Sequence, residues 1–325
     1  MLNRFRAKLG FLLASFLLVP AQATEYPTKP VTVVVGYSAG GPLDSFMRAL
    51  APRLSEALKQ PVVIDNRPGA NESIAAQTVA KAPADGHTLL MSTESPLTQN
   101  QFLYKKLAYV AERDFAPITQ LVHVPMALVV PASFPANTLP ELLALARSRK
   151  SNPINYGSTG MGGVTHLPMA MFAKNNGLEY VHVPYKGASP LIPDLLSSNV
   201  DAAFLAVSAV APYVIDRRLK ALVVSAPARA TALPQIPTFY ELGIEDVQAS
   251  FIMALSAPAG TSQLIIDKIA GLAQKIVADK EFRAKYMEPF AYVPVSSTPA
   301  EFSAYLAKDR RVQAERIRVS GASLD

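Results

Sequence analysis

Two glycine-rich loops are the segments of this chain whose residue types suit ligand binding. The first follows an apolar run, Val31–Val35, comprises Gly36–Gly41, and precedes a helical pattern that begins near Asp44. The backbone N–H groups at a helix start have no partner within the helix and carry the positive end of its dipole. Glycines let a ligand approach that backbone closely. The pattern therefore predicts an anion site, most simply for a carboxylate or phosphate.

A second unit of the same kind occurs far downstream. A short strand pattern at Ile154–Ser158 is followed by the loop Thr159–Gly163 and a helix start at Val164–Leu167. If each unit belongs to its own α/β lobe, the two helix starts can face each other across a cleft. Neutral backbone donors would then hold a carboxylate without an arginine. Hydrogen bonds of this charge-assisted kind contribute roughly 1.5–3 kcal/mol each.

Two other interpretations of the first loop remain open. It can be an ordinary strand-to-helix turn without a ligand. Alternatively, Gly36–Gly40 matches G-x-S-x-G, the nucleophile elbow of esterases, with Ser38 as nucleophile. That elbow needs an oxyanion loop from an earlier strand, and almost no mature chain precedes Val31. The esterase-like hydrolase is therefore the second function class.

The N-terminus has the three parts of a secretory signal peptide. Three basic residues among the first eight precede the apolar run Leu9–Val19, and Ala21–Ala23 is an A-x-A cleavage signal. The run is shorter than the roughly 20 residues that span a bilayer. We expect residues 1–23 to be removed by cleavage near Ala23, with a retained anchor as the alternative. The product would then be exported, and periplasmic in a Gram-negative cell.

Composition excludes several kinds of chemistry. The chain has 325 residues, of which 50% are hydrophobic and 17% charged, so it is globular and long enough for two domains. It contains no cysteine, and its four histidines lack ligand spacing. We therefore expect no metal and no cofactor. The net charge of +6 falls to +3 without the three basic residues of segment 1–23, and no Lys/Arg cluster suggests nucleic acid.

Strand patterns alternate with helical ones, which favours parallel sheets with right-handed crossovers. Strands are expected at 31–35, 61–65, 86–91, 118–124, 126–130, 154–158, 180–185, 202–206, 221–225 and 251–257. Helices are expected at 44–58, 73–80, from 139, from 164 to 174, and at 190–196, 262–278, 280–286 and 299–317. Ligands of such sheets bind beyond the carboxyl ends of the strands. The loops 36–41, 66–72 and 92–96 lie at such ends, and the last brings Thr93 into the candidate site.

Seven segments in order, covering nearly the whole mature chain, resemble one family. Together they look like the Bug family, the extracytoplasmic substrate-binding proteins of tripartite tricarboxylate transporters. Each segment alone is a weak signal, and seven in register are specific. The segments are residues 26–31, 40–44, 62–70, 84–90, 113–118, 182–187 and 257–261.

The resemblance implies an α/β, two-lobed periplasmic-binding-protein fold of type II, the Venus flytrap. Its two parallel-type sheets with flanking helices would be joined by a double hinge crossing. Residues 24–124 and 226–325 would form lobe 1, and residues 125–225 lobe 2. The resemblance also implies that the protein is not an enzyme and that its ligand is a small carboxylate. Its partners would be the membrane subunits of a tripartite tricarboxylate system, and the protein itself would be a monomer. A ligand-sensing protein that feeds a signalling receptor is a further alternative.

The resemblance and the strand ends together define a set of candidate ligand-binding residues. The first loop contributes six of them, the second loop five, and the neighbouring strand ends three. They are Tyr37, Ser38, Ala39, Gly40, Gly41, Asp44, Ser158, Gly160, Val164, Thr165, His166, Thr93, Tyr185 and Leu205.

Several of these side chains have a structural alternative. Asp44 can be a helix N-cap, His166 can cap its own helix, and Tyr185 can pack in the core. Glu72 and Glu94 either face an amine or amide of the ligand or lie at a solvated rim.

The chain departs from the family pattern in four places near the expected cleft. It has Asn71–Ser73 where the family often has Gly-Gly-Asn, and Leu205 where an aspartate is common. It lacks the tryptophan usual near Phe251, and its first loop opens with Gly36–Tyr37 in place of Pro-Phe. These changes leave the family assignment intact and bear on the identity of the ligand. The loss of an acid at position 205 weakens the case for an amino-acid ligand.

Overall fold

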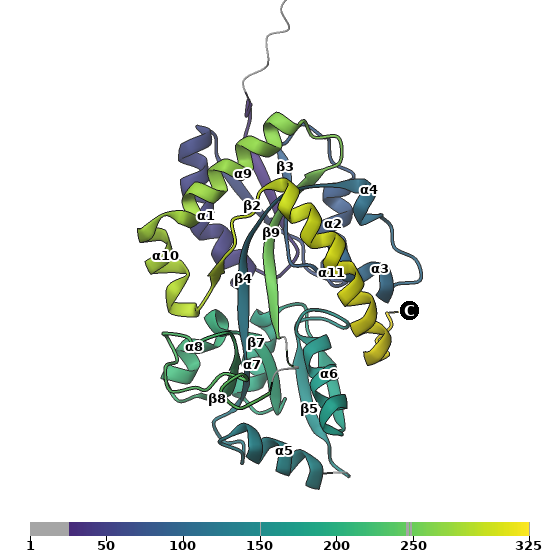
Figure 1. Ribbon diagram of the computed structural model, residues 1–325, viewed down its shortest axis with the longest axis vertical. Coiled ribbons are helices and arrows are strands. Elements are labelled where there is room, and N and C mark those ends of the chain that lie inside the picture. The colour runs from purple at the N-terminus through teal and green to yellow at the C-terminus, as the bar shows by residue number, and fades with distance from the viewer. Residues whose placement is uncertain (1–25, 150, 245–246, 248, 325) are drawn as a thin grey trace, which may run out of the picture.

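The computed structural model describes residues 26–149, 151–244, 247 and 249–324. The expected signal segment, with its cleavage site near Ala23, lies outside these residues. Within them, no helix is both long and apolar enough to cross a membrane. The molecule has two α/β halves, one above the other in Figure 1, each built on its own part of a continuous sheet.

The first half contains a mixed sheet with the strand order β2-β1-β3-β9-β4 and with β10 on the outer part of β4. Strands β1, β2 and β3 are parallel to one another, whereas β9 runs against both β3 and β4. The strands are β1 (Val31–Val35), β2 (Val62–Asn66), β3 (Thr88–Ser92), β4 (Phe115–Pro131), β9 (Ser250–Pro258) and β10 (Val293–Pro294). Its helices are α1 (Pro42–Leu58), α2 (Ser73–Ala80), α9 (Gln263–Ala278), α10 (Lys280–Tyr286) and α11 (Pro299–Ser320).

The second half is formed around the carboxyl-terminal part of β4. Strand β5 is parallel to β6 and β7, while β7 and β8 run against β4. The strands are β5 (Ile154–Ser158), β6 (Tyr180–Pro184), β7 (Ala202–Ala206) and β8 (Leu219–Ser225). The helices are α5 (Leu139–Ser148), α6 (His166–Asn176), α7 (Ala188–Leu196) and α8 (Val207–Ile215). The expected parallel pairing is thus present within β1–β3 and β5–β7, and the linking strands make both sheets mixed.

Strand β4 determines how the two halves face each other. Its residues 115–125 pair with β9, and its residues 126–131 pair with β7 and β8. Because β1–β3 run in the same direction as β4 and β5–β7 run opposite to it, the carboxyl ends of both parallel sets point to the junction between the halves. Figure 1 shows β4 and β9 passing between the halves at this junction. The two glycine loops, which leave β1 and β5, therefore meet there.

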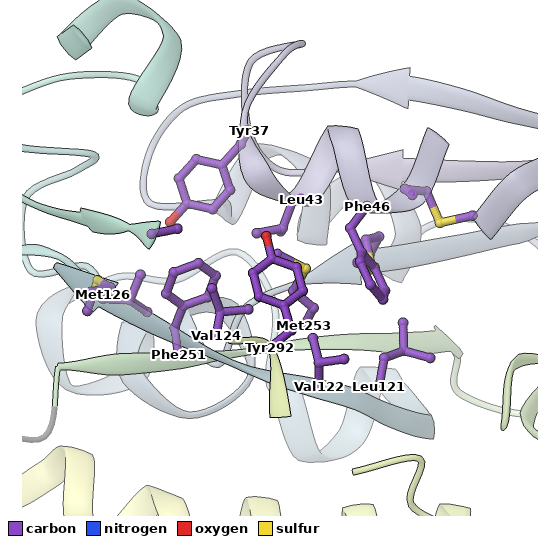
Figure 2. Packing of buried hydrophobic residues seen from close by; sticks show 14 of the residues in the cluster. Tyr37, Leu43, Phe46, Leu121, Val122, Val124, Met126, Phe251, Met253 and Tyr292 are labelled. Atoms are coloured by element: carbon purple, nitrogen blue, oxygen red, sulfur yellow. The ribbon is translucent and has the colours of Figure 1, made fainter. Parts of the chain in front are cut away.

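The hydrophobic core is continuous through β4. Val122, Val124 and Met126 on this strand belong to one buried cluster that includes Phe46 in the first half and Phe204 in the second. Figure 2 shows the β4 side chains of this cluster beside Phe251 and Met253 of β9. The two halves thus share one packed interior next to their junction.

The segment after β8 packs on the second half. The ring of Phe239 lies 6.1 Å from the rings of both Phe172 and Phe204, measured between centroids. The N–H of Phe239 donates to the carbonyl of Val224 in β8. Residues beyond position 225 therefore remain with the second sheet before β9 returns to the first.

The sequence patterns did not predict several short elements. They are the π-helix η1 (Ser95–Gln99), α3 (Asn100–Leu103), α4 (Ala111–Asp114), the 3-10 helix η2 (Glu288–Phe290), β10 and α8. Most are too short to show a helical period, and α8 contains Pro212, which argues against a helix in a sequence. The remaining expected elements are present with small shifts at their ends.

Phe204→Ala should destabilise the protein by about 3–5 kcal/mol, because it removes a fully buried ring from the contact with Phe172 and Phe239. Urea denaturation followed by circular dichroism measures this loss. Tyr240→Ala, at a side chain that is 71% exposed, is the control and should stay within about 0.5 kcal/mol of wild type. Equal effects for the two variants would contradict the packing described.

Candidate functional site

A small cavity lies at the junction between the two halves. Its volume is about 30 Å³, room for about two water molecules at the ~10–15 Å³ that one water needs. None of its lining side chains carries a charge. The lining residues are Tyr37, Gly41, Pro42, Leu43, Thr93, Thr159, Val164, Thr165, Ala188, Leu205, Ala206 and Phe251. Figure 2 shows Tyr37, Leu43 and Phe251 close together at this place.

The first wall of the cavity is the start of α1. Gly41 is the N-cap, and its N–H donates to the carbonyl of Ser38 over 3.3 Å. Gly40 has φ +79°, a conformation that favours glycine, and its N–H donates to Asp44 Oδ2 over 2.8 Å. The amide donors that remain at the helix start are those of Leu43 and Asp44, since an α-helix gives its first-turn N–H groups no partner.

Asp44 lies behind this wall, outside the cavity lining. It is the third residue of α1, so its expected role as the N-cap is wrong, and Gly41 has that position. Its carboxylate accepts from Gly40 N–H and from Arg48 Nε, each over 2.8 Å. Burial raises the pKa of Asp44, but these hydrogen bonds outweigh it and hold the pKa below its usual value. Asp44 therefore stays ionised and closes the first loop.

The opposite wall is the start of α6, with Thr165 as its N-cap. Thr159 N–H donates to Thr165 Oγ1 over 2.8 Å, and the two threonine hydroxyls are 2.9 Å apart. Gly160 N–H donates to Ser158 Oγ over 3.3 Å, so this loop also uses some of its own amides. The polar groups that reach the cavity here are the hydroxyls of Thr159 and Thr165 and the backbone beside Val164.

His166 lies at the start of α6 and does not line the cavity. Its Nδ1 accepts from the N–H of Gly162 over 3.0 Å, and its ring stacks on that of His182 with centroids 3.8 Å apart. Burial lowers the pKa of His166 to about 3, with a further contribution from His182. Burial also lowers the pKa of His182 to about 4, and its Nε2 lies 2.6 Å from Ser158 Oγ. The two rings are therefore neutral at physiological pH and support the loop from behind.

Ser38 and Ala39 join the two halves beside the cavity. Ser38 Oγ donates to the carbonyl of Lys186 over 2.9 Å, and Ser189 Oγ donates to the carbonyl of Ala39 over 2.9 Å. The Ser38 hydroxyl is thus engaged by a backbone carbonyl, and no histidine contacts it in the part of the chain that the structure describes. The geometry gives no support to a nucleophilic serine.

A second cavity of about 200 Å³ adjoins the first and shares Tyr37 and Thr159 as walls. Tyr185 lines this second cavity, where its hydroxyl donates to Asp194 Oδ2 over 2.6 Å. The Tyr37 hydroxyl is buried beside the hydroxyls of Thr93 and Thr159, without a hydrogen bond of good geometry to the described residues. Burial raises the pKa of Tyr37 well above its usual value, so the phenol is a neutral donor.

Glu72 and Glu94 are buried, so their expected rim positions are wrong. Glu72 is 1% exposed, and its carboxyl accepts from the N–H of Thr93 over 3.1 Å and is hydrogen-bonded to the Thr93 hydroxyl. Glu94 is 3% exposed and accepts from the N–H of Ile252 over 3.0 Å. Ala70, Asn71 and Glu72 all have positive φ, which turns the Glu72 side chain inward.

Of the candidate residues, the structure places six in the cavity wall. These are Tyr37, Gly41, Thr93, Val164, Thr165 and Leu205. The remaining lining residues were not among the candidates from the sequence, and they are Pro42, Leu43, Thr159, Ala188, Ala206 and Phe251. The helix starts after Gly41 and Gly187 were the available signal for Pro42, Leu43 and Ala188.

The fold and this cavity define a two-lobed α/β solute-binding protein of the periplasmic binding protein type. A sequence model described as "Tripartite tricarboxylate transporter family receptor" (TctC) matches residues 46–316. The chain is 31% identical to Protein BugT of Bordetella pertussis over 328 residues, which cover 99% of each chain. It is 34% identical over 308 residues to a Cupriavidus necator protein, covering 93% and 91% of the two chains.

Solved structures give the same result. R. palustris Rpa4515 with adipate has a TM-score of 0.87 at 29% identity, covering 92% of this chain and 100% of that chain. MatC of Rhodopseudomonas palustris with bound malate has a TM-score of 0.83 at 26% identity, covering 90% and 100%. The chain belongs to the TctC family of tripartite tricarboxylate transporter receptors, and it is similar to the Bug proteins BugT and BugD. These are transport receptors and not enzymes, so the hydrolase alternative is discarded.

The buried histidines should make the protein less stable in acid. Because the folded-state pKa of His182 is lowered to about 4, the unfolded chain binds more protons below about pH 6.5. The contribution of His182 to stability is present above that pH and is lost as the pH falls toward 4. Urea unfolding at pH 7.5 and pH 5 should show a smaller acid loss for His182→Gln than for wild type. An equal acid loss in the two proteins would contradict a neutral His182.

Proposed function

We propose that this protein captures a small organic acid at the junction of its lobes and delivers it to the membrane subunits of a tripartite tricarboxylate transporter. The observation that supports this most is the cavity itself. Two helix starts and the hydroxyls of Thr93, Thr159 and Thr165 surround an uncharged space. Relatives with the same fold have been solved with adipate and malate. One carboxylate of the ligand would lie among these neutral donors.

The division expected from the sequence has residues 24–124 and 226–325 in lobe 1 and residues 125–225 in lobe 2, and we propose one change to it. The packing of Phe239 on Phe172 and Phe204 favours adding residues 226–249 to lobe 2.

The contacts of Ser38 with Lys186 and of Ser189 with Ala39 would form when the lobes close. A cavity of about 30 Å³ has room only for the carboxylate end of an organic acid, so the rest of the ligand would extend into the adjoining cavity of about 200 Å³, and the lobes would part to admit it. The ligand would favour closure by binding the closed state more tightly.

The cellular setting follows from the family and the N-terminal sequence. Export with cleavage near Ala23 would place the mature chain in the periplasm as a monomer, with no role in nucleic-acid binding. The ligand-binding set would be the cavity wall together with Ser38 and Ala39, which form hydrogen bonds between the lobes, and Gly40, whose amide is bonded to Asp44. Ser158, Gly160 and His166 would shape the second loop, and Tyr185 the neighbouring cavity.

A thermal-shift screen of small organic acids on the mature protein, residues 24–325, tests the proposed function. We expect at least one di- or tricarboxylate to raise the melting temperature by several degrees, and titration calorimetry to give a micromolar or tighter Kd. The matching diamides, which lack the negative charge, should have no effect. Failure of malate, adipate and every other acid in the screen to bind would contradict the proposal.

Gly160→Leu should lower affinity for the best acid of the screen at least tenfold, with the fold unchanged. A Cβ at position 160 would touch Asn71 Oδ1 of the facing lobe at 3.4 Å, and the rest of a leucine side chain would fill part of the adjoining cavity between the lobes. Gly271→Leu is the matched control, because a Cβ there has no neighbour within 4 Å. Calorimetry should give wild-type affinity for the control. Wild-type affinity in Gly160→Leu would show that ligand binding does not need this contact.

A further inference from the structure

The carboxyl group of Glu72 lies directly behind the cavity wall. It is hydrogen-bonded to the hydroxyl of Thr93, and Thr93 lines the cavity. The hydrogen bonds that the structure gives this carboxyl all come from Thr93, through its N–H and its hydroxyl. Thr93 therefore connects a buried acid with the place proposed for the ligand carboxylate.

Two local features accommodate the Glu72 side chain. Ala70, Asn71 and Glu72 have φ values of 47°, 48° and 67°, and non-glycine residues in this region are strained. A Cβ at Gly36 would lie 2.7 Å from both Cβ and Cγ of Glu72, so only glycine at position 36 leaves room for it. Strained backbone of this kind is found most often at functional sites.

The Thr93 hydroxyl has only one hydrogen to donate. Its oxygen already accepts from the N–H of Ser95 over 3.1 Å. When Glu72 is ionised, it can only accept, so the Thr93 hydrogen points to Glu72 and away from the cavity. When Glu72 is protonated, its O–H can donate to Thr93 Oγ1. The Thr93 hydrogen is then released to donate into the cavity.

We propose that Glu72 is a positioning residue that sets the direction of the Thr93 hydroxyl, so that binding of a carboxylate takes up one proton from solvent at Glu72. This inference rests on the proposed function. The proton adds to a Glu72 oxygen, and no other bond forms or breaks. The ligand gains a donor at Thr93, and a second negative charge next to it is removed.

The groups around Glu72 are compatible with this role. Burial raises the pKa of Glu72 to about 7, although the hydrogen bonds from Thr93 lower it in part. Burial, and then the charge of Asp309, raises the pKa of Glu94 to about 8. The charge of Glu72 adds to burial in raising the pKa of the phenols of Tyr37 and Tyr109. The remaining titratable groups across the adjoining cavity are Tyr104, Tyr185 and the exposed Lys186.

Titration calorimetry with malate, in two buffers of different ionisation enthalpy, counts the protons taken up on binding. Wild type should take up close to one proton at pH 8, and its Kd should rise by up to about tenfold per pH unit above about pH 7. In Glu72→Gln the amide group donates to Thr93 permanently. This variant should take up no proton, keep a constant Kd, and bind malate more tightly than wild type at pH 8.

Glu94→Gln is the matched control, since it removes a buried acid that is bonded to Ile252 N–H and not to Thr93. It should keep the proton uptake. Binding of malate by wild type without proton uptake, or the same uptake in Glu72→Gln, would overturn the inference while leaving the proposed function intact.

If malate does not bind, carbon-13 NMR of the glutamate carboxyls in the ligand-free protein tests the protonation of Glu72 directly. The signal that is missing in Glu72→Gln should titrate near pH 7. Titration of that signal below pH 5 would overturn the inference by itself.

Discussion

Strand β4 belongs to both sheets, and most of the architecture depends on this. Its 17 residues give one ladder to β9 in the first half and another to β7 and β8 in the second. Because β1–β3 run with β4 and β5–β7 run against it, both sets of carboxyl ends meet at the junction. A loop that leaves β1 and a loop that leaves β5 then face each other, although they are far apart in sequence. The junction is therefore a consequence of strand direction, and the loop residues determine what it binds.

The cavity at this junction offers dipoles and no formal charge. Its polar groups are threonine hydroxyls, the phenol of Tyr37, first-turn amides of α1 and the backbone beside Val164 in the loop before α6. An arginine in this place would lose its hydration each time the lobes close, and removing an ion from water is costly. Neutral donors have a smaller desolvation cost, and a carboxylate strengthens each hydrogen bond that it accepts. Of the neighbouring ionisable side chains, Asp44 is paired with Arg48 and the two stacked histidines are neutral, whereas the carboxyl of Glu72 lies directly behind Thr93.

Much of this structure could be predicted from the sequence because its signals are local. The apolar strand, small-residue loop and helix start at 31–50 and 154–174 each occupy consecutive residues, and both are present. Strand β4 was predicted as two pieces because Pro125 interrupts the apolar run. In the structure Pro125 pairs with Ser250 where the ladder passes from one half to the other, a position that tolerates proline.

The details of the site depend on contacts that residue types do not reveal. The amide of Gly40 was expected to be available to a ligand, but the Asp44 carboxylate, four residues along, accepts it. Glu72 was expected to face solvent or a ligand amine, and three successive left-handed residues turn it into the interior instead. No period or composition predicts three such residues when none is glycine. Thr159 was missed because its hydroxyl is brought to the cavity by Thr165, its partner across the loop.

A crystal structure of the mature protein with the tightest acid of the screen tests the central claim most directly. The account predicts a ligand carboxylate within hydrogen-bond distance of the Leu43 and Thr165 amides and of at least two of the threonine hydroxyls in the cavity wall. No lysine or arginine nitrogen should lie within about 4 Å of its oxygens. A carboxylate held by an ion pair, or bound away from the junction of the lobes, would contradict the account.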